Sequence, residues 1–180
     1  MSKPFRLGLI VGRFQMLHLG HVDMISKALD ICERVILFAG SSQESRTAKN
    51  PLTFDERKKM LSKTFPDNNL LILPLPDAGI GNNEKWGGYI LSQIPSEYGT
   101  PDITISGRES RRSTWFDNQN IAELFVAKKI EISATEMRDF LKNDNKFAWM
   151  EYSPCEIQNM YSKLRKIILD TQNVTTTESI

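Results

Sequence analysis

The chain has 180 residues, a net charge of +1 and 40% hydrophobic residues, which suits a single domain with a full core. The near-neutral charge excludes a strongly basic surface for nucleic acid or an anionic membrane. No apolar run reaches the roughly 18 residues of a transmembrane helix, and no signal-peptide pattern begins the sequence, so we expect a soluble, cytoplasmic protein. The two cysteines, Cys32 and Cys155, predict no disulfide framework.

The first predicted unit is a strand, a loop and a helix. Leu7–Val11 is an almost unbroken apolar run, typical of a strand buried on both faces of a parallel sheet. A helix is predicted from Val22 onward, where apolar residues recur at helical spacing. The loop between them contains both histidines of the chain, His18 and His21, with Gly20 where the loop becomes helix. Glycine permits close approach of a ligand and the helix start offers free N–H groups, so the loop predicts a phosphate site.

The spacing of the two histidines leaves two other roles open. Three residues apart near a helix start, they could decorate the surface or form half of a metal site. The sequence has no third histidine and neither cysteine lies nearby, which disfavours metal binding. We therefore expect no metal held by the protein's own side chains.

Strand and helix patterns alternate along the next hundred residues. Strands are predicted at 35–38, 70–73 and 103–105, whereas 121–126 is compatible with either a helix or a strand. Thr53–Glu56 is a Thr-x-x-Glu capping box that begins a helix. The alternation favours a doubly wound parallel α/β sheet with helices on both faces. Ligands bind such sheets beyond the carboxyl ends of the strands, where the histidine loop falls.

The C-terminal part is predicted to be helical. Ser133–Glu136 is a second capping-box pattern, and Ser153–Glu156 is a third, with proline at the first helical position. The apolar stripe of the last helix, which we interpret as core packing, consists of Ile157, Met160, Tyr161, Leu164, Ile167 and Ile168. Residues 171–180 are polar and threonine-rich, so we expect one domain over 1–170 followed by a frayed tail.

Three ordered segments of the chain resemble the nucleotidylyltransferase superfamily. They are Gly-Arg-Phe-Gln at 12–15 with His-x-Gly-His at 18–21, the segment 40–57, and Ile132–Arg138. The segment 40–57 is similar to the archaeal type of nicotinamide mononucleotide (NMN) adenylyltransferase. That type also forms the N-terminal half of bacterial proteins fused to a Nudix hydrolase domain. The resemblance spans residues 7–169 and implies a Rossmann-like nucleotide-binding sheet.

The resemblance implies transfer of AMP from ATP to the 5′-phosphate of NMN, which yields NAD and pyrophosphate. In this superfamily the acceptor phosphate attacks the α-phosphorus in line, without a covalent intermediate, and the enzyme supplies positioning and charge neutralisation. A Mg²⁺ ion that bridges the ATP phosphates carries part of the charge. The implied partners are small molecules, with no nucleic acid and no membrane, and the oligomeric state stays open, a homo-oligomer included.

The resemblance also assigns catalytic roles to individual residues. His18 and His21 match positions that contact the ATP phosphates and stabilise the transition state, and Arg13 matches an arginine near both phosphate groups. Lys49 falls where many relatives carry arginine, and it can supply a charge but no bidentate fork. Arg138, one turn into a predicted helix, belongs to a second phosphate clamp.

The remaining implied site residues bind the two substrates. On the ATP side they are Gly12, Phe14, Gln15, Gly20, Gly107, Ser133 and Thr135. On the nicotinamide side they are Asp77 and Trp86, since an indole face can stack on a cationic pyridinium. Local alternatives stay open, because Trp86 could anchor the core, Ser133 could only cap its helix, and Arg138 could pair with a neighbouring carboxylate.

Other positions match the family less closely. Met16 replaces the usual proline and Ala134 fills a small-residue slot, and neither change removes a chemical group that the reaction needs. Arg57 is as compatible with a structural role as with a functional one. The basic segment 107–116, with arginines at 108, 111 and 112, is either a mobile loop that closes on ATP or a solvated charge run. The sequence contains no Nudix box, so we expect no second hydrolase activity.

Two rival functions remain from the sequence. One is a sister adenylyl- or cytidylyltransferase, for example with phosphopantetheine as acceptor, which the segment 45–51 and Trp86 disfavour. The other is a non-catalytic nucleotide-binding sensor, which the complete set of Arg13, His18, His21 and Arg138 disfavours.

Overall fold

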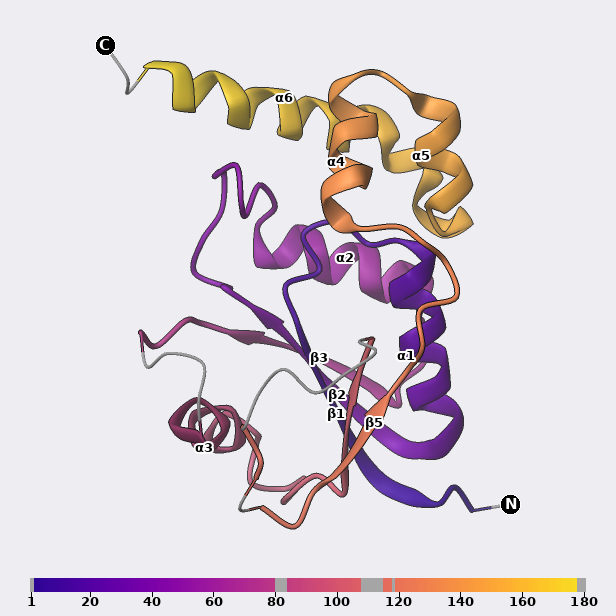
Figure 1. Cartoon of the computed structure of the whole chain (residues 1–180), viewed down its shortest axis with the longest axis vertical. Helices are drawn as coiled ribbons and strands as arrows, with labels where there is room; N and C mark the ends of the chain where they lie inside the picture. Colours follow the sequence, from indigo (N-terminus) through magenta and orange to yellow (C-terminus); the bar gives the residue numbers. More distant parts are fainter. Residues whose placement is uncertain (1, 80–83, 108–114, 118, 178–180) are drawn as a thin grey trace.

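One parallel sheet of five strands, in the order β3-β2-β1-β4-β5, forms the centre of the molecule (Figure 1). The computed structural model describes residues 2–79, 84–107, 115–117 and 119–177, without the side chains of residues 84 and 172–177. The strands are β1 (Phe5–Gly12), β2 (Cys32–Gly40), β3 (Leu70–Leu75), β4 (Ile103–Ser106) and β5 (Ala122–Phe125). The four strands predicted from apolar runs are confirmed, and the ambiguous segment 121–126 is a strand.

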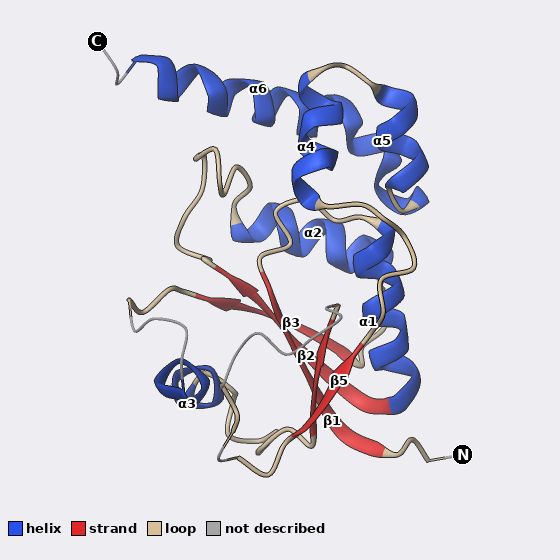
Figure 2. Cartoon of the chain, viewed as in Figure 1, coloured by secondary structure: helices blue, strands red, loops and turns tan. Residues whose placement is uncertain are grey.

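Helices cover both faces of this sheet, which confirms the doubly wound class. They are α1 (Leu19–Ile31), α2 (Phe54–Thr64), α3 (Glu84–Ser92), α4 (Ala134–Lys142), α5 (Lys146–Tyr152), the short 3₁₀ helix η1 (Cys155–Met160) and α6 (Tyr161–Thr177). Figure 2 shows α1 and α2 on one side of the strands and α3 on the other. The predicted capping box of α2 is present, with reciprocal hydrogen bonds between Thr53 and Glu56.

Side chains of the central strands point alternately into two separate cores. Ile10 and Leu37 belong to the core that includes buried residues of α1 and α2. Their neighbours Leu9 and Ile36 belong to the core beneath α3. Because both faces are covered, nearly every residue of these strands is apolar, which explains the unbroken apolar runs in the sequence.

The chain reverses its direction of winding between β1 and β4. From β1 it proceeds outward through β2 to β3, and then returns to form β4 and β5 on the other side of β1. The carboxyl ends of β1 and β4, followed by the loop after Gly12 and by Gly107, therefore lie side by side at this switch point. Crevices at such switch points are where open α/β sheets bind ligands.

Helices α4, α5 and α6 gather at one end of the molecule, beyond α2 (Figure 1). The predicted stripe of the last helix is confirmed as core, since Ile157, Leu164 and Ile168 are buried and Ile167 packs against them. Helix α6 extends through Thr177, into the segment for which the composition predicts a tail. Neither glycine nor proline interrupts this segment, and extending an existing helix costs far less than nucleating one.

The third predicted capping box is wrong. Helix α5 ends at Tyr152, so Ser153 follows a helix instead of beginning one, and its hydroxyl is buried without a hydrogen-bond partner. Pro154 then leads into the 3₁₀ helix η1, which has no side-chain cap. The upstream helix prevails because Asn145 caps it, accepting a hydrogen bond from the Ala148 N–H.

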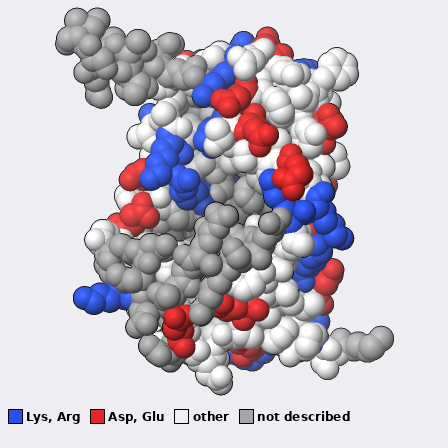
Figure 3. Space-filling model, in the orientation of Figure 1, with Lys and Arg blue, Asp and Glu red and all other residues white. Residues whose placement is uncertain are grey.

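The surface carries charges of both signs. Figure 3 shows acidic and basic side chains interspersed over the visible face. Cys32 is a buried free thiol and Cys155 an exposed one. In the described part of the chain, no helix combines the length and the apolar character needed to cross a bilayer.

Candidate functional site

A cavity of about 590 Å³ lies at the switch point, beside the carboxyl ends of β1 and β4. Its walls come from the loop after β1, the start of α1 and the linker 126–134 between β5 and α4. Seven of the predicted site residues line it: Gly12, Phe14, His18, Gly20, His21, Gly107 and Ser133. The fold thus brings together segments more than a hundred residues apart in the chain.

The two histidines stack on each other in this cavity. Their ring centroids are 3.7 Å apart and their planes differ by 25°. His18 is the residue before α1, and its carbonyl accepts hydrogen bonds from the N–H groups of His21 and Val22, which fixes both residues on the first turn. A Cβ at Gly20 would lie 3.1 Å from Nδ1 of His18, so any other residue there would press on the His18 ring.

Burial keeps both imidazoles neutral. It lowers the pKa of His18 to about 4, helped by the nearby Lys128, and it lowers the pKa of His21 well below its usual range, helped by His18. The Nδ1 atoms of both rings are buried without a hydrogen-bond partner. A bare acceptor is tolerated better than a bare N–H, so we infer that each proton is on Nε2. The pair therefore offers Nε2–H donors to a ligand.

The loop that precedes the histidines adopts an unusual backbone conformation. Phe14 has a φ of +50°, in the left-handed region that non-glycine residues enter only at a cost of about 1–3 kcal/mol. Its buried ring lies 4.9 Å from the His21 ring. A Cβ at Gly12 would come within 3.0 Å of the Phe14 ring, so a side chain there would displace it. Phe14 thus packs against the His21 ring, and Gly12 leaves the space that the Phe14 ring occupies.

The charge of Arg13 acts on Arg138, in the second turn of α4. Arg138 is half-buried, and its pKa is lowered by burial and then by the charge of the nearby Arg13. Its Nη2 donates to the Thr135 hydroxyl over 3.1 Å. Within the described residues, no ion pair links Arg138 to a carboxylate, although Asp139 is close enough to raise its pKa. Like charges repel each other, so an anion bound between these two arginines would be stabilised by both.

Ser133 caps α4. Its hydroxyl oxygen accepts a hydrogen bond from the Glu136 N–H over 3.2 Å and its proton is donated to the Glu136 carboxylate over 2.6 Å. This is half of the predicted box, because the carboxylate bonds the hydroxyl instead of the backbone of Ser133. Ser133 therefore caps its helix, as one of the two alternatives proposed, and it also lines the cavity.

Gln15 and Arg57 support the site from outside it. The buried Gln15 amide donates to the Leu52 carbonyl over 3.2 Å and accepts from the Leu52 N–H over 2.9 Å, which ties the loop after β1 to the loop before α2. Arg57 is fully buried and donates only to backbone carbonyls. Neither side chain lines the cavity.

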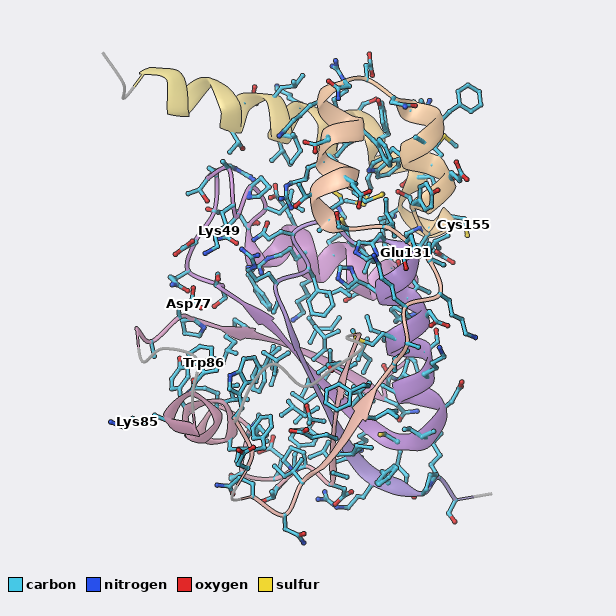
Figure 4. The ribbon with its side chains drawn as sticks, viewed as in Figure 1. Lys49, Asp77, Lys85, Trp86, Glu131 and Cys155 are labelled. Atoms are coloured by element: carbon cyan, nitrogen blue, oxygen red, sulfur yellow. The ribbon has the colours of Figure 1, made fainter. Side chains whose placement is uncertain are left out.

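Three predicted residues lie apart from the cavity, on the side of β2 and β3. In Figure 4 Lys49, Asp77 and Trp86 are on the left, whereas Glu131, at the cavity wall, is on the right. Lys49 and Asp77 are exposed. Trp86 is half-buried, 5.1 Å from the Tyr89 ring, and packs against the core beneath α3. The predicted basic segment at 108–112 lies outside the described residues.

Some cavity residues were not predicted from the sequence. Lys128 and Lys129 also line the cavity, and Lys128 pairs with Glu131 over 2.8 Å. Their only sequence signal is a basic pair shortly before the segment 132–138. Asp23, also in the wall, pairs with Lys27. Among the described residues, no three His, Cys, Asp or Glu side chains cluster as metal ligands would.

Sequence comparison identifies relatives over most of the chain. The cytidylyltransferase-like family model matches residues 9–162. A nicotinamide-nucleotide adenylyltransferase of Thermococcus kodakarensis is 30% identical over 176 residues, which cover 89% of this chain and 84% of the relative. The enzyme of the same name from Pyrococcus abyssi is 38% identical over 146 residues, covering 73% and 70% of the two chains.

Solved structures share the fold. A bifunctional NMN adenylyltransferase/ADP ribose pyrophosphatase of Francisella tularensis superposes with a TM-score of 0.73 at 21% identity, over 97% of this chain and 55% of that one. The same protein complexed with AMP and a manganese ion gives a TM-score of 0.70 at 22% identity. This chain thus spans about half of that solved protein. From its sequence relatives, the chain belongs to the cytidylyltransferase-like family and, within it, to the nicotinamide-nucleotide adenylyltransferases.

Proposed function

We propose that this chain transfers the AMP group of ATP to the 5′-phosphate of NMN and produces NAD and pyrophosphate. The observation that carries the proposal is the stacked, neutral pair of His18 and His21 in a cavity at the switch point. Arg13 belongs to the loop after β1 that lines this cavity, and Arg138 to α4, whose start forms part of the wall. Hydrogen-bond donors and cations so arranged suit a ligand whose phosphates gain charge during reaction. The shared name of the sequence relatives supports the same activity.

The histidine pair serves the triphosphate. With ATP in the cavity, the Nε2–H groups of His18 and His21 donate to phosphate oxygens. The negative charge of the phosphates raises the pKa of both rings from their low values. The imidazoles can then hold a proton more firmly as charge moves to the leaving pyrophosphate, which stabilises the transition state.

The arginines and the start of α4 hold the same phosphates from the other side. Arg13 and Arg138 gain the anion that relieves their mutual repulsion, and the free N–H groups near Ser133 and Thr135 add the positive end of a helix dipole. Gly107, at the end of β4, leaves space for the nucleoside. These contacts fix the α-phosphorus for attack.

The chemical step is one displacement at phosphorus. An oxygen of the NMN phosphate attacks the α-phosphorus, and the bond from that phosphorus to the oxygen bridging to the β-phosphate breaks. Pyrophosphate leaves with the bonding electrons, so no covalent enzyme intermediate forms. Magnesium enters as part of the substrate, bound to the ATP phosphates, and supplies further charge neutralisation.

NMN occupies the side of the site where β2 and β3 end. The exposed Lys49 supplies a point charge there for phosphate, and Asp77 lies at the carboxyl end of β3. The half-buried indole of Trp86 stacks on the cationic nicotinamide ring. We expect the enzyme to act in the cytoplasm, where free thiols such as Cys32 and Cys155 stay reduced.

An acceptor panel tests this proposal. The protein is incubated with ATP and magnesium, and separately with NMN, nicotinic acid mononucleotide and phosphopantetheine, and the products are identified by mass. We expect NAD from NMN, and no product once the magnesium is chelated. A product only with phosphopantetheine would show a sister transferase. Binding of ATP without turnover of any acceptor would show a sensor.

A further inference from the structure

The least exposed charged side chain in the described part of the chain is Arg57, near the start of α2. Its exposed fraction is 0%. All three guanidinium nitrogens donate to backbone carbonyls: Nη1 to Arg13 over 2.7 Å and to Gly40 over 2.6 Å, Nη2 to Ser41 over 3.3 Å, and Nε to Thr53 over 3.3 Å. One side chain thus joins the loop after β1, the end of β2 and the start of α2.

This bonding pattern differs from that of Arg46 in the same region. Arg46 is exposed and forms a two-pronged ion pair with the Glu56 carboxylate, over 2.7 and 2.8 Å. Arg57 forms no such pair with any described carboxylate, and Asp77 acts on it only as a charge at longer range. Burial lowers its pKa to about 10, so it stays charged at neutral pH. Burying a cation that bonds only to carbonyls costs desolvation free energy, because no carboxylate neutralises its charge. Such a residue therefore suggests a role beyond stability.

The segments that Arg57 joins are those that shape the phosphate side of the site. The Arg13 carbonyl is held directly, and the charge of the Arg13 side chain lowers the pKa of Arg138. Ser41 has a φ of +47°, a left-handed conformation that its neighbours must maintain. The loop that continues from Ser41 carries Lys49. Without the guanidinium, four carbonyls would lose a donor and these segments could shift independently.

We propose that Arg57 is a positioning residue of the transfer reaction, which sets the place of Arg13 and of the loop after β2 through its four carbonyl contacts. Since Arg57 is fully buried, it acts without touching either substrate. This inference rests on the proposed function. A shift of about 1 Å in a group that aligns phosphates is enough to cost on the order of 10²-fold in rate.

Two variants separate positioning from mere stability. Arg57→Lys keeps the charge and loses the planar set of donors, and Arg57→Gln keeps neutral donors and loses the charge. The control is Gln158→Ala in the C-terminal helices, because Gln158 also donates to two backbone carbonyls, those of Met150 and Ser153. Each protein is assayed for NAD formation and for equilibrium binding of MgATP, at a temperature where circular dichroism shows it to be folded.

We expect both Arg57 variants to lower kcat by about 100-fold and to weaken MgATP binding by about tenfold. Gln158→Ala should lower only the melting temperature. Normal kcat and MgATP affinity in both folded Arg57 variants would overturn the proposal and leave a structural role. Activity retained by Arg57→Lys alone would overturn it too, since charge would then suffice without the full carbonyl set.

A double-mutant cycle tests whether the effect passes through Arg13. In an Arg13→Ala background, Arg57→Lys should change kcat by less than about threefold, because the group that it positions is gone. If the losses in kcat from the two substitutions were additive, Arg57 would not act through Arg13. Should the wild-type chain form no NAD, the proposed function fails on that result alone, and the MgATP affinities of the same variants still decide the role of Arg57.

Discussion

The two sides of the site differ in how firmly their side chains are held. On the proposed ATP side, His18 and His21 stack on each other and are fixed by the first turn of α1 and by the Phe14 ring. On the NMN side, Lys49 and Asp77 are exposed and share no described cavity with the histidines. The histidine pair is therefore held in place by contacts within the protein itself.

This difference in how firmly the side chains are held predicts which kinetic constant each side affects. A preorganised side can stabilise the transition state, because its donors need no reorganisation as charge develops. An exposed side must order its side chains when the acceptor binds, which reduces affinity without changing the chemical step. We therefore expect variants on the ATP side to lower kcat and variants on the NMN side to raise KM for NMN.

The largest expected effect is that of His21→Ala. Removing one preorganised donor to the transition state should lower kcat by 10²-fold or more, with little change in the melting temperature. His21→Gln, whose amide can place a donor near the position of Nε2, should recover part of that loss. Lys49→Ala should lower kcat by less than tenfold, because an exposed lysine is a mobile point charge. Steady-state kinetics on the three variants provides the test, and equal losses at the two sites would contradict the comparison.

The next effect is on stability at acid pH. The pKa of His18 is about 4 in the folded protein and 6.5 ordinarily, so between these values the unfolded chain binds more protons. Stability should therefore fall as the pH falls from about 6.5 to about 4, by about 3 kcal/mol in total for this residue. Urea unfolding at several pH values measures it. The pKa of His21 is also lowered by burial, so His21 adds a decline of its own. His18→Gln should therefore reduce the dependence, and the double variant His18→Gln/His21→Gln should remove most of it; a parallel decline in the double variant would show that other groups cause it.

The cavity around the histidines was largely predictable because its signals are local. A buried parallel strand is an apolar run, and a histidine loop that leads into a helix lies at the end of such a strand by construction. The capping boxes at Thr53 and Ser133 are patterns within four residues, and both caps are present. The same pattern failed at Ser153, because a helix that ends there competes for the residue.

Other features depend on contacts that no local pattern contains. Arg57 donates to the Arg13 carbonyl across 44 positions of the chain and to the Gly40 carbonyl across 17. The left-handed φ of Phe14 arises from packing, since phenylalanine has no intrinsic preference for it. The Lys128 wall of the cavity exists only because β5 pairs with β4 and directs the following linker across the site.

A smaller effect is expected from Trp86→Ala on the NMN side. Loss of the stacking face should raise KM for NMN by about fivefold, the scale of one exposed cation–π contact, and leave KM for ATP unchanged. Trp86→Phe retains an aromatic ring, so its KM for NMN should lie between those of the wild type and of Trp86→Ala. Because Trp86 also packs on Tyr89 and the core beneath α3, the melting temperature is measured alongside. A fall in stability with unchanged KM for NMN would favour the core anchor.

The smallest effect should separate the two roles of Ser133. Ser133→Ala removes the cap of α4, and Thr53→Ala removes the equivalent cap of α2, away from the cavity, so each should lose about 1 kcal/mol of stability. Only Ser133→Ala should also raise KM for ATP, by about two- to threefold. The increase is small because the hydroxyl must release the Glu136 carboxylate before it can bond a phosphate. Equal KM values for ATP in the two variants, at equal loss of stability, would assign Ser133 to capping alone and leave the phosphate contact at this end of the cavity to Arg138 and the N–H groups of α4.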